Sequence, residues 1–108
     1  MTAHAAFTPE AIRDIDSIAE FYAVESPAIA QRFYLSVDAT AQLLAENPLI
    51  GRLYEPAVPD FEGLRVWGVR SFRAILVLYV PADHGARVMR VYHAKRDQAE
   101  VFRRDADE

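Results

Sequence analysis

The order of helix and strand signals along this 108-residue chain predicts one α+β domain, with a helical hairpin packed on one face of an antiparallel sheet. Two helix starts, each a hydroxyl residue followed by proline, stand close together at Thr8-Pro9 and Ser26-Pro27. Three strand-like runs with tight turns between them fill the second half. The predicted order is therefore β-α-α-β-β-β in a single domain over residues 1–108, because a chain of this length builds one core.

The first two elements are predicted from helix capping and apolar periodicity. His4–Phe7 is a short apolar segment, which we expect to form an edge strand. Thr8 then provides an N-cap for the proline that follows it. Apolar residues recur at three- and four-residue spacing, which predicts a helix over Pro9–Val24 with Ile12 and Ile15 on its apolar face.

The second helix is predicted to begin at Ser26-Pro27 and to end at Asn47-Pro48, because proline disfavours a helical residue before it. The link between the helices has only two or three residues, so they are expected to fold back as an antiparallel hairpin. We expect Phe33, Val37 and Leu44 to face the sheet. The candidates for the opposing contacts are Ile12, Ile15, Leu76 and Leu78.

The rest of the chain is predicted as a loop followed by a three-stranded meander. Prolines and glycines between Pro48 and Gly63 predict a loop that is long enough to be functional, although a plain connector is favoured. Breaker residues separate the three runs after it. The predicted strands are Leu64–Val69, Phe72–Val80 and Arg87–His93, followed by a helical turn at Asp97–Arg103 and a frayed acidic tail at Asp105–Glu108.

Charge is distributed unevenly along the chain, whose net charge is −4. The stretch from Leu64 to Arg104 holds nine cations and three acids and carries +6, so the other residues carry −10. Such asymmetry predicts a basic face that meets an acidic partner, either protein or nucleic acid. The alternative is that the strands carry solvated arginines on one side, and composition alone does not decide between the two.

Several classes of chemistry have no support in the sequence. The chain lacks cysteine, which removes disulfide scaffolds and thiolate metal sites and is compatible with a reducing cytosol. No histidine pair has helical ligand spacing, no serine stands in a nucleophile elbow, and the glycines are scattered, so no metal or cofactor is expected. The N-terminus lacks a signal-peptide pattern, and the longest apolar run, Ala74–Val80, is too short to cross a membrane as a helix.

Four residues of the C-terminal part have the side-chain types that a metal-free ribonuclease needs. Such an enzyme requires a base, an acid and cations for the phosphorane. These types are present in Arg90, Tyr92, His93 and Arg96. On a strand, His93 shares a face with Met89 and Val91, and a structural role is favoured for it over a catalytic one. Tyr92 shares the other face with Val88 and Arg90.

Trp67 has a similar pair of interpretations. It shares a predicted strand face with Arg65 and Val69, so it is either packed on the sheet or an exposed anchor for a partner. Tryptophan and arginine together are favoured in protein–protein hot spots, although packing alone is the more common outcome.

The C-terminal half of the chain resembles ParE-type toxins of the ParE/RelE superfamily. That half typically runs as a basic strand, a strand closing in tyrosine, and a strand ending in histidine followed by Arg-Asp. The matching segments are Leu64-Arg-Val-Trp-Gly-Val-Arg-Ser-Phe-Arg73, Ile75-Leu-Val-Leu-Tyr79 and Val88-Met-Arg-Val-Tyr-His-Ala-Lys-Arg-Asp97. Upstream, the resemblance extends to Phe7-Thr-Pro-Glu-Ala, Asp14-Ile-Asp-Ser-Ile-Ala-Glu-Phe-Tyr22, Ala30-Gln-Arg-Phe33 and Asn47-Pro-Leu-Ile-Gly51.

The resemblance implies a toxin of a type II toxin–antitoxin system, of the kind that serves plasmid stabilisation, neutralised by a ParD-like antitoxin with an extended, helical tail. ParE-type members poison DNA gyrase, whereas RelE-type members cut messenger RNA in the ribosome. The acidic net charge and the presence of one lysine, Lys95, depart from the ribonuclease pattern. We therefore expect a cytoplasmic gyrase poison without catalytic residues of its own, and a ribosome-dependent mRNA endonuclease of the RelE type is the alternative.

The resemblance also directs attention to the basic residues as partner contacts. We expect the antitoxin to lay an acidic, amphipathic segment across the sheet face that the helices leave uncovered. The candidate contacts to the antitoxin or the target are Arg65, Trp67, Arg70, Arg73 and Arg96. DNA is expected to be contacted only indirectly, through the antitoxin or gyrase, and no membrane is involved.

Overall fold

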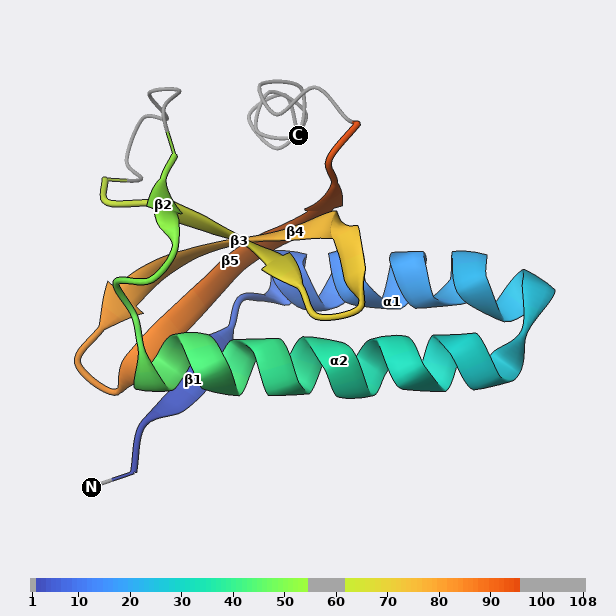
Figure 1. Ribbon diagram of the computed structural model, residues 1–108, viewed down its shortest axis with the longest axis horizontal. Helices are drawn as coiled ribbons and strands as arrows, with labels where there is room; N and C mark the ends of the chain where they lie inside the picture. The colour runs from blue at the N-terminus through green and yellow to red at the C-terminus, as the bar shows by residue number, and fades with distance from the viewer. Residues whose placement is uncertain (1, 55–61, 96–108) are drawn as a thin grey trace.

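The computed structural model describes residues 2–54 and 62–95 and places two helices on one face of a five-stranded sheet (Figure 1). The predicted helical turn and acidic tail, and Arg96, lie outside the described residues. The sheet order is β1-β5-β4-β3-β2. The elements are β1 (His4–Phe7), α1 (Pro9–Glu25), α2 (Pro27–Glu46), β2 (Arg52–Leu53), β3 (Arg65–Val69), β4 (Phe72–Ala82) and β5 (Gly85–His93).

The α+β class and the helical hairpin are confirmed, and β1 is an edge strand as predicted. Two features differ from the expected sheet. It is mixed, because β1 runs parallel to β5, which the intervening helices and strands allow. The predicted loop also contributes the short strand β2, which pairs antiparallel with the start of β3.

Local capping explains why both helices begin where the sequence predicts. The Thr8 hydroxyl accepts a hydrogen bond of 3.0 Å from the Ala11 amide and donates one of 2.8 Å to the Met89 carbonyl. It therefore both starts α1 and ties it to β5. Ser26 ends α1 through its backbone and caps α2 by accepting from the Ile29 amide at 3.3 Å.

The main core lies between the helices and one face of the sheet. Phe33, Val37 and Leu44 are buried there, as expected for the inner face of α2. Ile15 is buried as well, whereas Ile12 is 49% exposed and lies outside the buried cluster, lining a surface pocket beside Val37. The sheet contributes its part of this cluster from Val69, Ile75, Val77, Tyr79, Ala86, Val88 and Val91.

Leu76 and Leu78 were expected to face the helices, and this prediction is wrong. Strand side chains alternate between faces, and Ile75, Val77 and Tyr79 occupy the helix side. Leu76 and Leu78 therefore belong to a second cluster on the opposite face. The other members of that cluster are Val66, Tyr92 and Tyr54. The run Ala74–Val80 is apolar at every position, so its sequence does not alternate between apolar and polar residues. Its inner face could therefore not be predicted.

A register shift in β5 corrects one further expectation. The pairing between β4 and β5 shifts between Leu78 and Tyr79, so Met89 is an extra residue opposite this step. Val88 consequently joins the helix-side cluster, whereas Tyr92 belongs to the cluster on the other face. The expected shared face for Val88 and Tyr92 is therefore wrong.

Candidate partner-binding site

A groove of about 910 Å³ opens between the C-terminal half of α2 and the β3 side of the sheet. Three of the predicted contact residues, Trp67, Arg70 and Arg73, line it. The expected location was the sheet face that the helices leave uncovered, so the structure places these residues differently, where α2 meets the sheet margin. The remaining lining residues are Ala39, Thr40, Gln42, Leu43, Glu46, Gly68, Val69 and Leu76.

One end of the groove is fixed by a contact between α2 and the turn after β3. The Arg70 amide donates a hydrogen bond of 3.0 Å to the hydroxyl of Thr40, which is buried in α2. The next residue, Ser71, adopts a positive φ of 66°, which completes the tight turn into β4. The backbone that carries Arg70 and Arg73 is therefore attached to the helix that forms the opposite wall.

The groove combines exposed apolar surface with unequal charge at its two ends. Leu43 on α2 is 41% exposed, and Trp67 on β3 is 36% exposed, so both present apolar surface to solvent in the groove. Arg70 and Arg73 are exposed near the turn, and no ion pair involves either of them within residues 2–54 and 62–95. Glu46 lies at the end of α2. This surface suits a partner with apolar and acidic side chains.

Arg65, the fourth described candidate, does not line the groove. Its guanidinium donates to the carbonyls of Gly51 at 2.7 Å and Leu49 at 3.3 Å. The buried Tyr79 hydroxyl holds the same loop, accepting from the Gly51 amide at 2.9 Å and donating to the Pro48 carbonyl at 2.8 Å. Desolvation raises the pKa of Tyr79 above its usual value, so this hydroxyl remains a donor. Arg65 therefore stabilises the loop after α2.

Arg90 belongs to an ion pair with α1. Its Nε donates to Asp14 Oδ2 at 2.7 Å and its second terminal nitrogen to Asp14 Oδ1 at 3.0 Å. Asp14 Oδ2 also accepts from the Val91 amide at 3.0 Å. Both side chains are largely buried, with 13% of Arg90 and 16% of Asp14 exposed. This bidentate geometry fixes the Arg90 guanidinium against the N-terminal half of α1.

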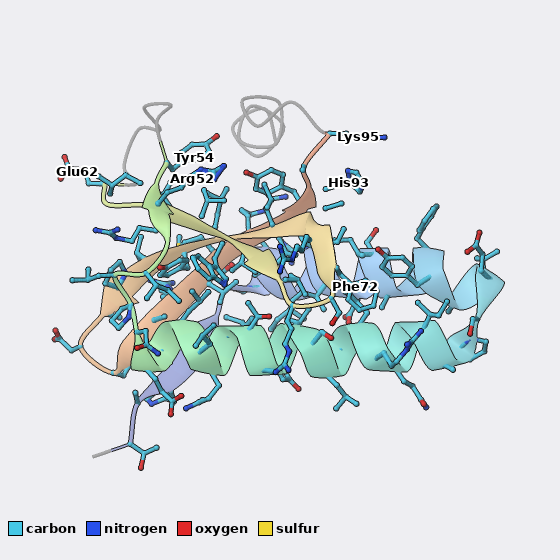
Figure 2. The ribbon with its side chains drawn as sticks, in the orientation of Figure 1. Arg52, Tyr54, Glu62, Phe72, His93 and Lys95 are labelled. Carbon is cyan, nitrogen blue, oxygen red and sulfur yellow. The ribbon has the colours of Figure 1, made fainter. Side chains whose placement is uncertain are left out.

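Tyr92 and His93 are not brought together by the sheet. The Tyr92 hydroxyl is buried in the cluster opposite the helices and has no hydrogen-bond partner among residues 2–54 and 62–95. Burial there, with a smaller contribution from Tyr54, raises the pKa of Tyr92 to about 12. His93 pairs with Ile75, whose side chain faces the helices, and its Nδ1 accepts from the Lys95 amide at 3.1 Å. Figure 2 shows His93 and Lys95 at the end of β5, well away from Arg52 and Tyr54 beside β2.

Sequence reasoning missed the α2 wall of the groove and the partner of Arg90. Leu43 stands beside the inner-face residue Leu44, and an apolar residue off the predicted inner face was an available signal. Asp14 precedes Arg90 by 76 residues, and no local pattern relates them.

Neither a metal site nor a membrane-spanning helix is found in the described part of the chain. Within residues 2–54 and 62–95, no three His, Asp or Glu side chains gather closely enough to hold a metal ion. His4 and His84 stack with their ring centroids 4.6 Å apart, and the Nδ1 of His84 lies 3.2 Å from the backbone carbonyl oxygen of His4. No helix in the same ranges combines the length and apolarity that a bilayer crossing needs.

The structure is a small α+β domain with an exposed groove where α2 meets the margin of the sheet. The family model described as ParE toxin of type II toxin-antitoxin system, parDE, matches residues 5–98, so the chain belongs to this toxin family. A solved structure described as the chromosomal ParDE TA system from P. aeruginosa has a similar fold, with a TM-score of 0.65 and 18% identity. That match covers 85% of this chain and 96% of the other. No curated protein matches.

Proposed function

We propose that this ParE-family toxin poisons DNA gyrase by binding it and does not itself cut messenger RNA. The observation that carries this proposal is the state of the candidate ribonuclease residues. Arg90 is bound to Asp14, the Tyr92 hydroxyl is buried, and His93 lies on the opposite strand face. A phosphodiester needs a base, an acid and a cation within reach of one phosphate, and these side chains do not converge in that way.

The alternative function is a ribosome-dependent mRNA endonuclease of the RelE type. The half-exposed imidazole of His93 close to Lys95 at the end of β5 is the feature that favours it (Figure 2). Such an enzyme would need a further acid or base beside His93, and Arg96 lies outside the described residues. The net charge of −4 is also unfavourable for entry into a ribosomal RNA cleft.

The groove between α2 and β3 is the proposed contact for a ParD-like antitoxin. Membership of the parDE family supports an antitoxin partner. The exposed Trp67 and Leu43 would bury apolar side chains of that partner, and Arg70 and Arg73 would attract its acids. Both proposed partners act in the cytoplasm, and DNA would be contacted only through the antitoxin or gyrase.

Two assays on the same purified toxin test this function. One measures DNA supercoiling by gyrase, and the other measures cleavage of messenger RNA bound to ribosomes. The proposal expects inhibition of supercoiling, relief of that inhibition by antitoxin, and intact messenger RNA. Cleavage of ribosome-bound messenger RNA together with unaffected supercoiling would replace it with the endonuclease function.

A further inference from the structure

The helical hairpin carries a pocket of about 190 Å³ between α1 and α2, separate from the groove. Ile15 and Val37, which belong to the main core, line it together with the exposed Ile12 and Tyr34. The remaining lining residues are Phe7, Asp16 and Asp38. The pocket and the groove lie on different sides of α2, because α1 forms the other wall of the pocket and β3 that of the groove.

Each helix contributes one carboxylate to the lining of this pocket, Asp16 from α1 and Asp38 from α2. No ion pair involves either residue within residues 2–54 and 62–95. The Tyr34 hydroxyl donates to Asp16 Oδ1 at 2.7 Å and so joins the two helices beside the pocket. This hydrogen bond, followed by burial and by the charges of Asp16 and Glu20, raises the pKa of Tyr34. The surroundings of the pocket are therefore electronegative.

The charge of the helices as a whole agrees with this local picture. Together α1 and α2 carry seven acids and two arginines. Asp14 is paired with Arg90, and Glu10 lies 3.7 Å from Arg13, whereas the pocket carboxylates have no such partner in the described ranges. Apolar walls with two carboxylates suit a side chain that has an aliphatic stem and a cationic end. Lysine and arginine have this form.

We propose that this pocket receives a lysine or arginine side chain from the protein that the toxin poisons. The inference rests on the proposed function and specifies the chemistry of the contact with the target. The aliphatic stem of the incoming side chain packs against Ile12 and the ring of Tyr34. Its cationic end binds the carboxylates of Asp16 and Asp38.

Charge complementarity favours the target over other occupants. The proposed target acts on DNA, and proteins that bind DNA contact its phosphates through lysine and arginine. The antitoxin is proposed to bring acidic side chains to Arg70 and Arg73 in the groove, and such side chains would be repelled by the pocket. A second copy of this chain could also supply a cation, and it would then give an oligomer of the free toxin.

The first test removes the two pocket charges and keeps the side-chain shapes. Gyrase supercoiling is titrated with wild-type toxin and with the Asp16→Asn, Asp38→Asn double variant. We expect the half-inhibitory concentration of the double variant to rise at least about tenfold, because a cation of the target loses its partners. Its Kd for the antitoxin should stay that of the wild type. The matched control is Glu10→Gln, Glu25→Gln, which removes the same charge outside the pocket and should inhibit as the wild type does.

The second test supplies the pocket with a cation from the chain itself. Ile12 is 49% exposed, so a long polar side chain can replace it without opening the core. The ammonium of Ile12→Lys would lie beside Asp16 and Asp38 and compete with the target, whereas Ile12→Met keeps the pocket apolar. We expect Ile12→Lys to inhibit gyrase at least about tenfold more weakly than Ile12→Met, with equal antitoxin affinities.

The outcomes separate this contact from the function on which it rests. Wild-type inhibition by the folded Asp16→Asn, Asp38→Asn variant overturns the pocket and leaves the gyrase function in place. Equal weakening by the Glu10→Gln, Glu25→Gln control overturns it as well, because the effect would then follow total charge. A free toxin that sediments as an oligomer, and that the pocket variant makes monomeric with gyrase inhibition unchanged, assigns the pocket to a second copy instead.

A wild-type toxin that leaves supercoiling unaffected overturns the proposed function and this inference together. Circular dichroism melts of every variant show whether it folds. If the Asp16→Asn, Asp38→Asn variant does not fold, the comparison of Ile12→Lys with Ile12→Met decides, and equal inhibition by these two variants overturns the proposal.

Discussion

Asp14 forms an ion pair with Arg90, one of the residues that the sequence suggested for catalysis. Its two oxygens accept from the Arg90 guanidinium and from the Val91 amide, which lies beyond the end of β1 on the same side of β5. The carboxylate thus satisfies a backbone donor that no strand of the described sheet covers, and it holds the guanidinium in a bidentate pair. Arg90 is therefore explained by the attachment of α1 to the sheet.

Asp14→Asn should destabilise the fold by about 3 kcal/mol, because it neutralises the carboxylate that pairs with the largely buried Arg90 guanidinium. A denaturant melt measures this change in the free energy of unfolding. The matched control is Asp16→Asn on the same helix, whose side chain accepts one exposed hydrogen bond from Tyr34. That change should cost less than about 1 kcal/mol. Equal effects of the two substitutions would show that the Asp14–Arg90 pair is not a stabilising contact.

Loss of the hydroxyl should have different effects on the stability of the fold at two buried tyrosines, Tyr79 and Tyr92. Tyr79→Phe removes the partners of the Gly51 amide and the Pro48 carbonyl, so it should cost about 1–3 kcal/mol. Tyr92→Phe removes a buried hydroxyl that has no partner in the described part of the chain, so stability should stay constant or rise by about 1 kcal/mol. Thermal or denaturant melts compare the two. A large loss of stability in Tyr92→Phe would contradict the assignment of its hydroxyl as unsatisfied.

Alkaline pH should destabilise the protein through Tyr92. Its pKa in the folded state is raised by burial to about 12 from its usual value of 10.0, so folding favours the neutral form. This contribution is fully present below pH 10 and is lost as the pH rises toward 12, because the unfolded chain releases the proton first. Melts between these pH values should show a smaller loss of stability in Tyr92→Phe than in the wild type. Identical pH profiles would contradict the raised pKa.

At the scale of elements, the hairpin attaches to the sheet through a small set of buried side chains. Phe33 is fully buried and contacts the rings of Tyr22 and Phe72 with centroids 5.5 and 5.3 Å away. Phe33→Ala should cost about 3–5 kcal/mol because it opens a cavity between the two layers. Leu35→Ala, on the exposed face of α2, is the control and should cost under about 1 kcal/mol. A small effect of Phe33→Ala in a denaturant melt would show that the packing face is wrong.

The charged end of the groove gives a separate prediction about affinity. Reversing both Arg70 and Arg73 to glutamate should weaken antitoxin binding by tenfold or more, about 1.4 kcal/mol, since acidic partner groups would then be repelled. Arg87→Glu, exposed on β5 away from the groove, is the matched control. Titration calorimetry at two salt concentrations measures both. A double variant that binds as tightly as Arg87→Glu would exclude the groove as the antitoxin site.

Features that depend on neighbouring residues could be predicted from the sequence, whereas features that depend on distant segments could not. The helix bounds were predictable because Thr8, Ser26 and Asn47 act on their own neighbours. Three features of the sheet could not be predicted, because each depends on which distant segment lies alongside. They are the parallel pairing of β1, the bulge at Met89 and the choice of the inward face of β4. For the site, Trp67, Arg70 and Arg73 were predicted from residue type, whereas the opposite wall from α2 arises only when the hairpin docks.

At the scale of the whole molecule, the charge asymmetry fits a protein that works by contact. The helices are acidic and the second half of the chain is basic, so charge is separated within the molecule although the net charge is only −4. Such a distribution steers acidic partners toward the cations that line the groove and limits non-specific binding to nucleic acid.

The most direct test of action by binding is toxicity of a His93→Gln, Tyr92→Phe double variant, induced in cells while growth and messenger RNA ends are followed. Both residues lie outside the groove, and removing a catalytic acid or base costs about 10²–10⁴ in rate. If the toxin acts by binding, a folded double variant should arrest growth nearly as well as the wild type, with no codon-positioned cleavage in either. Codon-positioned cleavage by the wild type that disappears, together with growth arrest, in the double variant would contradict this account.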